Sequence, residues 1–486
     1  MIFQDAAQFA ASGFTPQVCI VGAGPAGITI ANKLAAAGIP SVLLEGGAEE
    51  WTEDSQDVYR GVTIGDPYFD LDITRLRFLG GCSNHWAGWC RVLDAHDFTA
   101  KSYVPDTGWP IRRGDIEPFL PETFDVLGLH DFPPDRQTTD RFYRFEVQKS
   151  EAVRFGEKYR EAIAASEHIA LLLNTAAGEL VGDGTRITAA KLISNGAAAG
   201  EIAAPFFVVA TGGLENSRLL LWSNERSNGG VVPHADALGR YWMEHPMYWT
   251  GNAFLTDTAA LTPDHEGHAF FIPSPQAMAE REVLNFHVQV ETMPFSGAKR
   301  MIADLACHAP QTAEWVSNLL GAKLQCSARV HLDWEQAPRR HNRVALSTTE
   351  RDAYGVPRIE LHWKKDELDR HTMLEAMRMF GEDLARKDLG RVQISDWVLN
   401  GEDYPDDMEL AGNHHMGGTR MGTDVKTSVV DSDCRVHGMA NLFVGGSSVF
   451  TTSGQCTPTT TIVALALRLG DHLAREVVGV RTEAKA

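Results

Sequence analysis

At 486 residues the chain is long enough for two domains, and 44% hydrophobic with 22% charged residues is the composition of a globular protein. The formal charge of −20 argues against nucleic acid or an anionic membrane as a partner. It could favour a cationic substrate, but a solvated acidic surface explains it better. No apolar run reaches membrane-spanning length, and the N-terminal residues lack the basic stretch of a secretory signal. The seven cysteines form no C-x-x-C pair, so we expect no zinc site, no disulfide framework and a cytoplasmic location.

A glycine-rich turn near the N-terminus joins a predicted strand to a predicted helix, and a second predicted strand follows the helix. Residues 18–21 form a short apolar run that predicts a buried parallel strand, and residues 41–44 predict a second one. Residues 26–37 are expected to form the helix between them, ended by a glycine and a proline. A glycine-rich turn alone is a weak signal, but the order strand, glycines, helix and strand makes it a specific one.

The glycines of this turn have the G-x-G-x-x-G spacing. Gly22 allows a tight turn, Gly24 leaves room for a pyrophosphate, and Gly27 lets the helix pack closely on the strand. The free amides and the dipole at the helix start attract phosphate, and Glu45 can accept hydrogen bonds from a ribose diol. The motif therefore predicts a bound dinucleotide and leaves the choice between FAD and NAD open.

A second candidate ligand segment, residues 75–98, combines a double glycine with small polar residues, a histidine and tryptophans. Gly80 and Gly81 would allow a flat ligand to approach the backbone, and Ser83 and Asn84 could hydrogen-bond its polar edge. The alternative is an aromatic-rich structural loop without a ligand.

Two further strand–turn–helix units follow later in the chain. Residues 206–210 predict an apolar strand that leads through Thr211 into a helix, and residues 441–450 predict a strand that ends in a Gly-Gly-Ser-Ser turn. Pro458 lies at the start of a long apolar-faced helix over residues 457–474. We expect this C-terminal unit to close back on the N-terminal one, so that separated segments build the cofactor domain.

The middle of the chain has a different pattern. Four segments with alternating apolar residues predict an antiparallel sheet, followed by a long amphipathic helix over residues 366–386. These segments are residues 284–290, 328–334, 343–347 and 357–363. A sheet with helices on one face would form the wall of a substrate cavity.

Together these segments resemble the glucose–methanol–choline (GMC) oxidoreductases, a family of FAD-dependent alcohol and sugar oxidases and dehydrogenases. Within the family the chain is most similar to bacterial members related to pyranose oxidases and to sugar or sugar-acid dehydrogenases. The resemblance is strongest, in family order, at residues 18–47, 78–91, 210–223, 238–246 and 413–473.

The resemblance implies an α/β fold, α+β overall, with a Rossmann-like FAD-binding domain assembled from discontinuous segments. We expect residues 1–95, 150–245 and 411–486 to form that domain. Residues 96–149 and 246–410 would form a substrate or cap domain, with an antiparallel sheet backed by helices.

The resemblance also implies that the cofactor is FAD. His85 followed by Trp86 is similar to the pair through which some relatives bond the flavin covalently, but Cys82-Ser83-Asn84 departs from the pyranose oxidase pattern, so this link is a hypothesis. The residues expected to bind FAD are Gly22, Gly24, Ala26, Gly27 and Glu45 for the ADP half, Gly80, Gly81, Ser83, Asn84 and His85 along the flavin, and Thr211, Gly446, Ser447, Pro458 and Thr459.

Alcohol oxidation needs a base, and histidine suits this role because its ordinary pKa is near neutrality. The family has a histidine separated by two residues from a Gly-Thr pair, and His415 fits that spacing in the sequence NHHMGGT. His415 is therefore the expected catalytic base, whereas His414 and His245 are expected to be structural. We expect no metal, because no His/Cys/Asp cluster has ligand spacing and the family chemistry needs none.

Thr457 departs from the family pattern, in which a second histidine or an asparagine precedes the proline at the closing helix. A hydroxyl can still hydrogen-bond a substrate oxygen, but with shorter reach. Thr457 is the expected catalytic partner; a neighbour such as Asn413 or Gln455 could assist, or the departure could mean another substrate or reduced activity.

The function implied is FAD-dependent oxidation of a hydroxyl of a sugar, amino sugar, glycoside or polyol. His415 would take the hydroxyl proton, hydride would pass to flavin N5, and oxygen or another small acceptor would reoxidise the flavin. The alternatives are a hydroxynitrile-lyase-like enzyme of the same fold, a non-catalytic flavin-binding protein, and an NAD-linked dehydrogenase of plain Rossmann type.

Overall fold

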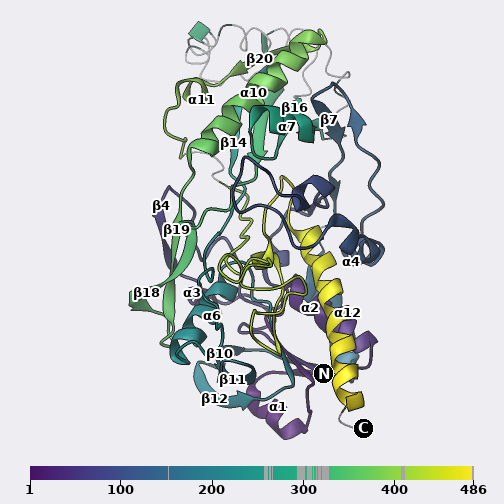
Figure 1. Ribbon diagram of the computed structural model, residues 1–486, viewed down its shortest axis with the longest axis vertical. Coiled ribbons are helices and arrows are strands. Elements are labelled where there is room, and N and C mark those ends of the chain that lie inside the picture. Colours follow the sequence, from purple (N-terminus) through teal and green to yellow (C-terminus); the bar gives the residue numbers. More distant parts are fainter. Residues whose placement is uncertain are drawn as a thin grey trace.

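The computed structural model describes residues 1–151, 153–256, 266–292, 328–406 and 411–483, with residues 261, 264, 302, 303, 309, 311, 312, 315 and 319 between them. Figure 1 shows a parallel sheet and its helices at the lower end of the molecule and an antiparallel sheet with helix α10 at the upper end. This is the mixed α/β architecture expected from the sequence.

A six-stranded parallel sheet forms the lower part, in the order β1-β9-β3-β2-β13-β21. Its central strands are buried throughout, which explains why their residues form continuous apolar runs rather than alternating ones. The predicted closure of the C-terminal unit on the N-terminal one is confirmed, because β21 pairs with β13 next to β2. The strands are β1 (Ile2–Phe3), β2 (Val18–Val21), β3 (Ser41–Leu44), β9 (Ile169–Leu172), β13 (Phe206–Val209) and β21 (Leu442–Val444).

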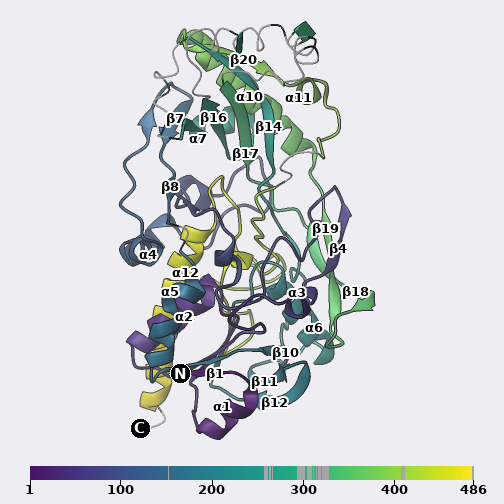
Figure 2. The ribbon, with the colours of Figure 1, turned by 180° about the vertical axis from the view of Figure 1, so that it is seen from behind.

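Helices from the two ends of the chain pack side by side on this sheet. Helix α12 (Thr459–Glu483) runs along α2 (Pro25–Ala36) in both Figure 1 and Figure 2. A Cβ on Gly470 would lie only 2.8 Å from the Cβ of Lys33, so the missing side chain sets this close approach. The other helices of the lower part are α1 (Ala6–Ser12), α3 (Glu53–Asp57), α4 (Leu120–Leu127), α5 (Phe155–Ala165) and α6 (Glu215–Arg226).

A three-stranded antiparallel sheet extends the lower part. It consists of β10 (Thr175–Gly182), β11 (Ile187–Ser194) and β12 (Ala197–Ile202). Asn195 and Gly196 join β11 to β12 with φ values of 49° and 78°. Two consecutive residues with positive φ are typical of a tight hairpin turn.

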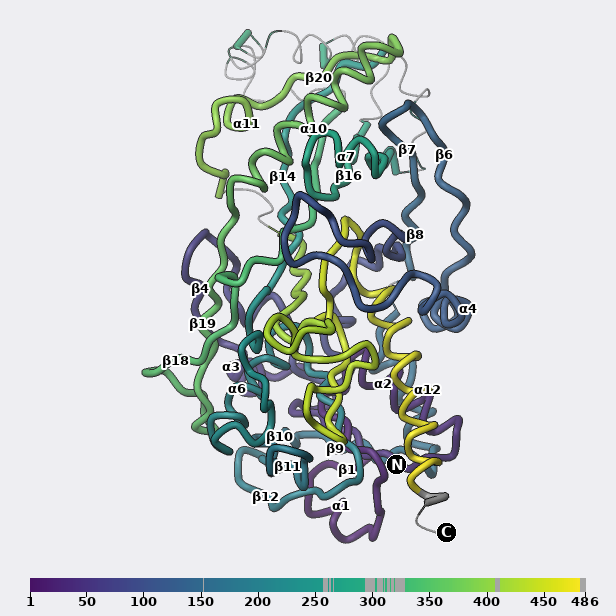
Figure 3. Tube along the Cα trace, viewed as in Figure 1, coloured from purple at the N-terminus to yellow at the C-terminus, as the bar shows by residue number. Residues whose placement is uncertain are grey.

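A seven-stranded antiparallel sheet forms the upper part, in the order β20-β14-β17-β16-β15-β7-β6. Helix α10 (Glu367–Arg386) packs on it, and Trp334 Nε1 donates a 2.9 Å hydrogen bond to Asp369 on that helix. Two short helices, α7 (Pro275–Arg281) and α11 (Asp396–Asn400), lie nearby in Figure 3. The strands are β6 (Arg136–Gln137), β7 (Phe142–Phe145), β14 (Met247–Leu255), β15 (His268–Pro273), β16 (Phe286–Thr292), β17 (Ala328–Trp334) and β20 (Gly390–Ile394), and a separate pair joins β5 (Trp89–Cys90) to β8 (Gln148–Lys149).

One sequence prediction was wrong: the four alternating segments do not form a single sheet. Strands β18 (Arg343–Arg351) and β19 (Pro357–Trp363) pair with each other and with β4 (Gly61–Gly65), which runs parallel to β19. Their inward residues pack around Trp242 in a small core of their own. Alternation predicts which face of a strand is buried, but it does not specify the strand's partner.

Within the described residues, no helix has the length and apolarity needed to cross a membrane. The five cysteines that the structure describes, Cys19, Cys82, Cys90, Cys434 and Cys456, are free thiols, whereas Cys307 and Cys326 lie outside the described residues. The domain boundaries remain a prediction, and β4 and β19 come from segments assigned to different domains.

Candidate active site

One cavity of about 920 Å³ extends from the glycine-rich turn to the antiparallel sheet. Its lower wall is formed by loops at the carboxyl ends of parallel strands β2, β3, β13 and β21, which is where open α/β sheets bind ligands. Its upper wall is the face of β14, β15, β16 and β17. Chain segments more than 400 residues apart in sequence therefore meet around one space.

The glycine-rich turn has the geometry of a phosphate site. The Cβ of a residue replacing Gly22 would lie 2.5 Å from the oxygen of Ala210, and one at Gly27 would lie 1.9 Å from the oxygen of Gly22. These two glycines are required by packing. Gly24 is different, because its φ of −88° suits any residue and no described atom lies within 4 Å of the position of its Cβ. Gly24 begins helix α2 without a capping side chain among the described residues, so the helix amides are available to a ligand.

Glu45 lies at the carboxyl end of β3, in the wall of the same cavity. Its carboxylate accepts hydrogen bonds from the amides of Gly47 at 2.8 Å and Ala23 at 3.3 Å. Burial raises the pKa of Glu45, while these amides and the charge of Arg77 act in the opposite direction. The oxygens keep acceptor capacity for a ribose diol, since each carboxylate oxygen has two lone pairs.

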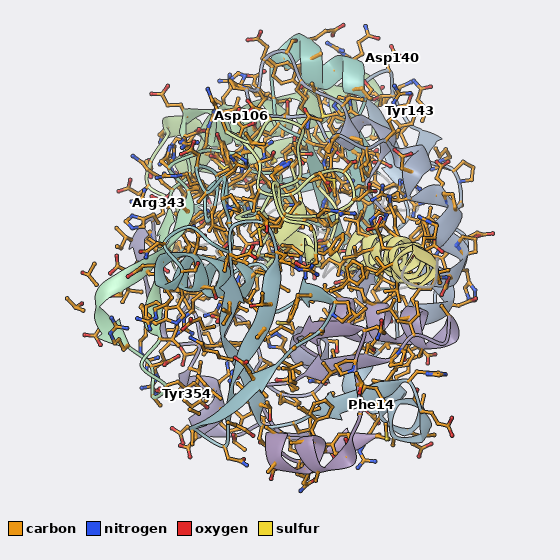
Figure 4. The ribbon with its side chains drawn as sticks, turned by 60° about the horizontal axis from the view of Figure 1, so that its bottom comes forward. Phe14, Asp106, Asp140, Tyr143, Arg343 and Tyr354 are labelled. Carbon is orange, nitrogen blue, oxygen red and sulfur yellow. The ribbon has the colours of Figure 1, made fainter. Side chains whose placement is uncertain are left out.

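Near Glu45 the cavity wall includes an aromatic side chain. Tyr354, at the lower left of Figure 4, comes from the turn between β18 and β19. The guanidinium carbon of Arg77 lies over the Tyr354 ring, 5.7 Å from the ring centre. Ala177 and Ile193 line the cavity there as well. The sequence analysis missed Tyr354, because only the pairing of β19 with β4 brings it to this wall.

Most of the predicted site residues line this cavity, but three do not: Gly27, Gly80 and Asn84. Gly80 has a φ of 93° and packs against Gly156 of α5, and Asn84 donates a 2.9 Å hydrogen bond to the oxygen of Leu79. Both residues shape the loop behind the wall. The lining includes Gly22, Gly24, Ala26, Glu45, Gly81, Ser83, His85, Thr211, Gly446, Ser447, Pro458 and Thr459, together with His415 and Thr457.

His415 is fixed in the cavity wall by its backbone. A Cβ on Gly213 would lie 2.1 Å from the oxygen of His415, and Ser447 Oγ donates a 2.6 Å hydrogen bond to that same oxygen. The loops after β13 and β21 thus hold His415 between them. Residues 243 and 416 form an antiparallel bridge, which places Glu244 and His245 beside the two adjacent histidines.

The His415 ring belongs to a buried hydrogen-bond chain. Its Nε2 lies 3.1 Å from the hydroxyl of Tyr68, and that hydroxyl donates to Glu244. Burial, with the charge of Arg75 as a smaller cause, lowers the pKa of His415 well below its usual value. The imidazole is therefore neutral at pH 7, as a general base must be.

The structure also brings His414 to the cavity, which the sequence analysis did not expect. His245 Nε2 lies 2.7 Å from the oxygen of Gly454, so this nitrogen carries a proton. Burial lowers the pKa of His245 to about 4 and that of His414 to about 3, so both rings are neutral at pH 7. The Nδ1 of His245 is then an acceptor, and His414 Nδ1 donates to it across 2.8 Å. This leaves the unprotonated nitrogen of His414 at Nε2, and the ring lines the cavity.

Polar and aromatic side chains cover the sheet face opposite the histidines. His287 and Gln289 alternate with buried valines along β16, and His331 and Asp333 alternate with buried apolar residues along β17. Trp249 on β14 has its ring 4.8 Å from that of His331. Burial would raise the pKa of Asp333, but the charges of His287 and His331 outweigh it and lower this pKa well below its usual value. The face offers donors, acceptors and a flat aromatic surface, which suits a ligand rich in hydroxyls.

The residues at the lower wall fit FAD. Gly24 is a glycine that neither backbone strain nor packing requires, and the uncapped start of α2 faces the same space. A Cβ added to Gly446 would lie 3.9 Å from the Cβ of Ala26. A second loop therefore borders the expected phosphate position at a residue that has no side chain.

Comparisons with known proteins agree with this geometry. Residues 338–466 match the family profile described as GMC oxidoreductase, and residues 15–66 match that of an FAD binding domain. The chain is 26% identical to a C-glycoside 3-oxidase of Microbacterium trichothecenolyticum, over 82% of this chain and 75% of the relative. It is 25% identical to a 2-methyl-1,2-propanediol dehydrogenase of Mycolicibacterium austroafricanum, over 96% of this chain and 97% of the relative.

The chain thus carries a GMC oxidoreductase domain in its C-terminal part and an FAD binding domain at its N-terminal end. Its fold is also similar to that of pyridoxine 4-oxidase from Mesorbium loti, with a TM-score of 0.58 at 16% identity over 94% of this chain and 99% of that one. The cofactor is FAD, as the sequence predicted, and the activity is that of an FAD-dependent oxidoreductase acting on CH–OH groups. The FAD binding domain argues against an NAD-linked dehydrogenase of plain Rossmann type.

In this oxidoreductase the hydroxyl of Thr457 donates a 2.8 Å hydrogen bond to the oxygen of Trp89. Its single proton is engaged there, so the hydroxyl can accept a hydrogen bond from a substrate but cannot donate one. We expect Thr457→Ala to lower kcat/KM by about tenfold at most, chiefly through KM, because one neutral hydrogen bond is worth about 1 kcal/mol. Steady-state kinetics of Thr457→Ala beside Thr457→Ser measure this, and unchanged kinetics in both variants remove Thr457 from the site.

Proposed function

We propose that this enzyme oxidises a hydroxyl of a sugar, amino sugar, glycoside or polyol and passes the electrons to oxygen or another small acceptor. The observation that carries the proposal is the polar and aromatic face of β14, β16 and β17 opposite His414 and His415 in the cavity that begins at the glycine-rich turn. A hydroxyl-rich ligand on that face would present one carbon to the histidines and the others to hydrogen-bonding side chains. The relative that oxidises C-glycosides supports this class.

In the proposed mechanism the chain orients the substrate and manages its proton. Trp249 and the polar residues of β16 and β17 hold the ring of the substrate, and the walls exclude water from the reacting hydroxyl. His415 takes the hydroxyl proton as a neutral base. Bound FAD supplies the acceptor for the hydride that leaves the substrate carbon.

His414 is a second candidate for the base, and a specific observation favours it. The contacts of His245 with Gly454 and with His414 fix the tautomer in which His414 Nε2 is unprotonated. The spacing before Gly-Thr favours His415, whereas this fixed tautomer favours His414. Alanine variants of the two residues separate the candidates.

The proposal is tested by anaerobic mixing of the purified holoenzyme with alcohols, sugars, amino sugars and glycosides. We expect the flavin absorbance to bleach with a sugar or glycoside, and oxygen to restore it if oxygen is the acceptor. Cleavage of a hydroxynitrile without bleaching by any alcohol would instead identify a lyase. If neither bleaching nor cleavage occurs, the chain is a non-catalytic flavin-binding protein. The lyase result and the absence of any reaction would each contradict the proposal.

The covalent flavin link at His85 is a separate hypothesis. His85 lines the cavity, and burial together with the charge of Arg154 lowers the pKa of its ring, so the imidazole is available as a nucleophile. Acid precipitation of the holoenzyme tests it directly. Yellow colour that remains with the pellet supports the link, and colour that leaves entirely with the supernatant rules it out.

A further inference from the structure

Next to His415, and joined to it through Tyr68, lies a carboxyl group that has no role in the proposed mechanism. Glu244 is fully buried, and its Oε1 accepts hydrogen bonds from the amides of His245 at 2.8 Å and His414 at 2.7 Å. Its Oε2 accepts from the hydroxyl of Tyr68, which also lies 3.1 Å from His415 Nε2. A buried carboxyl, a phenol and an imidazole are thus connected in one line.

Aromatic rings enclose this line and fix its members. Tyr68 packs edge-on against Trp363 at 5.0 Å and Trp242 at 6.0 Å, and the ring of Trp242 lies 5.8 Å from that of His415. Both tryptophans are at most 1% exposed. The hydrogen bonds between these three groups give a proton a direct path along the line.

The hydrogen bonds allow two arrangements. When Glu244 is ionised, Tyr68 donates to it and accepts from His415 Nε2–H, which leaves the lone pair of His415 at Nδ1. When Glu244 is protonated, its proton is donated to the oxygen of Tyr68, and Tyr68 donates to His415 Nε2. His415 then carries its proton at Nδ1. The second arrangement holds one proton more than the first: Glu244 is protonated, and the proton of His415 is at Nδ1 instead of Nε2.

We propose that Glu244 and Tyr68 form a proton relay behind His415, with Glu244 as the group that stores the substrate proton. The proposal rests on the proposed function with His415 as base. The substrate hydroxyl proton bonds to His415 Nδ1, the Nε2–H proton passes to the oxygen of Tyr68, and the Tyr68 proton passes to Glu244. The electron pair of the broken C–H bond leaves with the hydride, so the substrate becomes a carbonyl compound and no charge remains on His415.

The electrostatics of the site suit this role. Burial raises the pKa of Glu244 to about 7, although the hydrogen bonds from Tyr68 and the two amides act in the opposite direction. Burial and the neighbouring Glu244 raise the pKa of Tyr68 well above its usual value, so Tyr68 conducts protons without becoming an anion. The titratable groups facing Glu244 are Tyr68, His245 and His414, with His415 and Arg75 beyond Tyr68.

Only ionised Glu244 can accept the proton, and this sets the direction in which the rate of flavin reduction depends on pH. The rate of flavin reduction should rise as the pH increases through about 7, where Glu244 loses its proton. Glu244→Gln keeps the shape of the side chain and can accept from both amides through its oxygen. Its amide group donates to Tyr68, which fixes His415 in the Nδ1–H tautomer. We expect reduction to be slower by about tenfold or more, with the rise near pH 7 absent.

The decisive experiment reads the tautomer itself in holoenzyme whose histidines carry ¹⁵N. In the unsubstituted enzyme the His415 signal should change from the Nδ1–H to the Nε2–H tautomer as the pH rises through about 7. Glu244→Gln should remain Nδ1–H throughout, and Tyr68→Phe should uncouple His415 from this titration while keeping the aromatic packing. Tyr248→Phe is the matched control, because Tyr248 is a buried tyrosine outside the relay, and it should behave as the unsubstituted enzyme does.

Three results would overturn the relay: a His415 tautomer that does not change with pH, a change that persists in Glu244→Gln, or a change that persists in Tyr68→Phe. If Glu244→Gln does not fold, Tyr68→Phe alone still decides the question. Failure of the proposed function is distinguishable, because it appears as a lack of bleaching by any alcohol while the tautomer titration is still read without substrate.

Discussion

Replacing His415 with alanine should leave FAD bound and slow anaerobic bleaching by substrate roughly 10²- to 10⁴-fold, the usual contribution of a general base. The cofactor should stay because the structure assigns His415 to the wall between the loops after β13 and β21, held through its backbone oxygen rather than its ring. The measurement is stopped-flow absorbance under nitrogen, with bound flavin quantified beforehand.

His414→Ala is the informative comparison, because the two histidines are adjacent and share the same cavity. If His415 is the base, His414→Ala should reduce the rate much less than His415→Ala does. The reverse order would transfer the role to His414, whose unprotonated Nε2 is fixed by His245. Undiminished bleaching in His415→Ala would remove that residue from proton transfer and would also remove the basis of the relay through Tyr68.

A matched control for both variants is His437→Ala. His437 is bonded to Ser428 at 2.9 Å and does not line the cavity. The flavin of His437→Ala should therefore bleach at the rate of the unsubstituted enzyme. That result would show that loss of a histidine outside the cavity does not affect bleaching.

The parts of this molecule that could be predicted from sequence are local. Residues 18–45 contain strand, turn, helix and strand within one short segment, and the observed β2, α2 and β3 follow the predicted ranges to within one residue. The same is true of β17 and β19, whose alternation is complete within seven residues each. Spacing and periodicity suffice where the partners are close in the chain.

The parts that could not be predicted depend on distant pairing. Tyr68 reaches His415 across 347 positions, and Glu244 reaches His414 across 170. Nothing in the pattern around Tyr68 marks it, because its position follows from β4 joining β19 in a sheet whose partners the alternation does not specify. The tautomer of His414 likewise could not be predicted from the sequence. It depends on His245, which is oriented by the carbonyl of Gly454 on a third segment of the chain.

Gly24→Val should fold normally and bind FAD about 5- to 150-fold more weakly, because a side chain placed in an occupied position costs about 1–3 kcal/mol. The φ of −88° at Gly24 is ordinary for valine, and no described atom lies within 4 Å of the new Cβ, so the protein alone gives no reason for glycine here. Gly114→Val is the matched control, since Gly114 also has no described neighbour within 4 Å and lies outside the cavity lining.

Flavin titration of the Gly24→Val and Gly114→Val apoproteins measures their affinity for FAD, and thermal unfolding measures whether each folds normally. Equal melting temperatures with weaker FAD binding only in Gly24→Val would assign the glycine to the cofactor. A lower melting temperature in Gly24→Val would instead mean that the backbone requires glycine. Full affinity in Gly24→Val would contradict a close approach of the pyrophosphate to this residue, and the start of α2 would then no longer explain how the cavity holds its anion. Gly22 and Gly27 cannot answer this question, because their substitution collides with the protein's own backbone whether or not a ligand is bound.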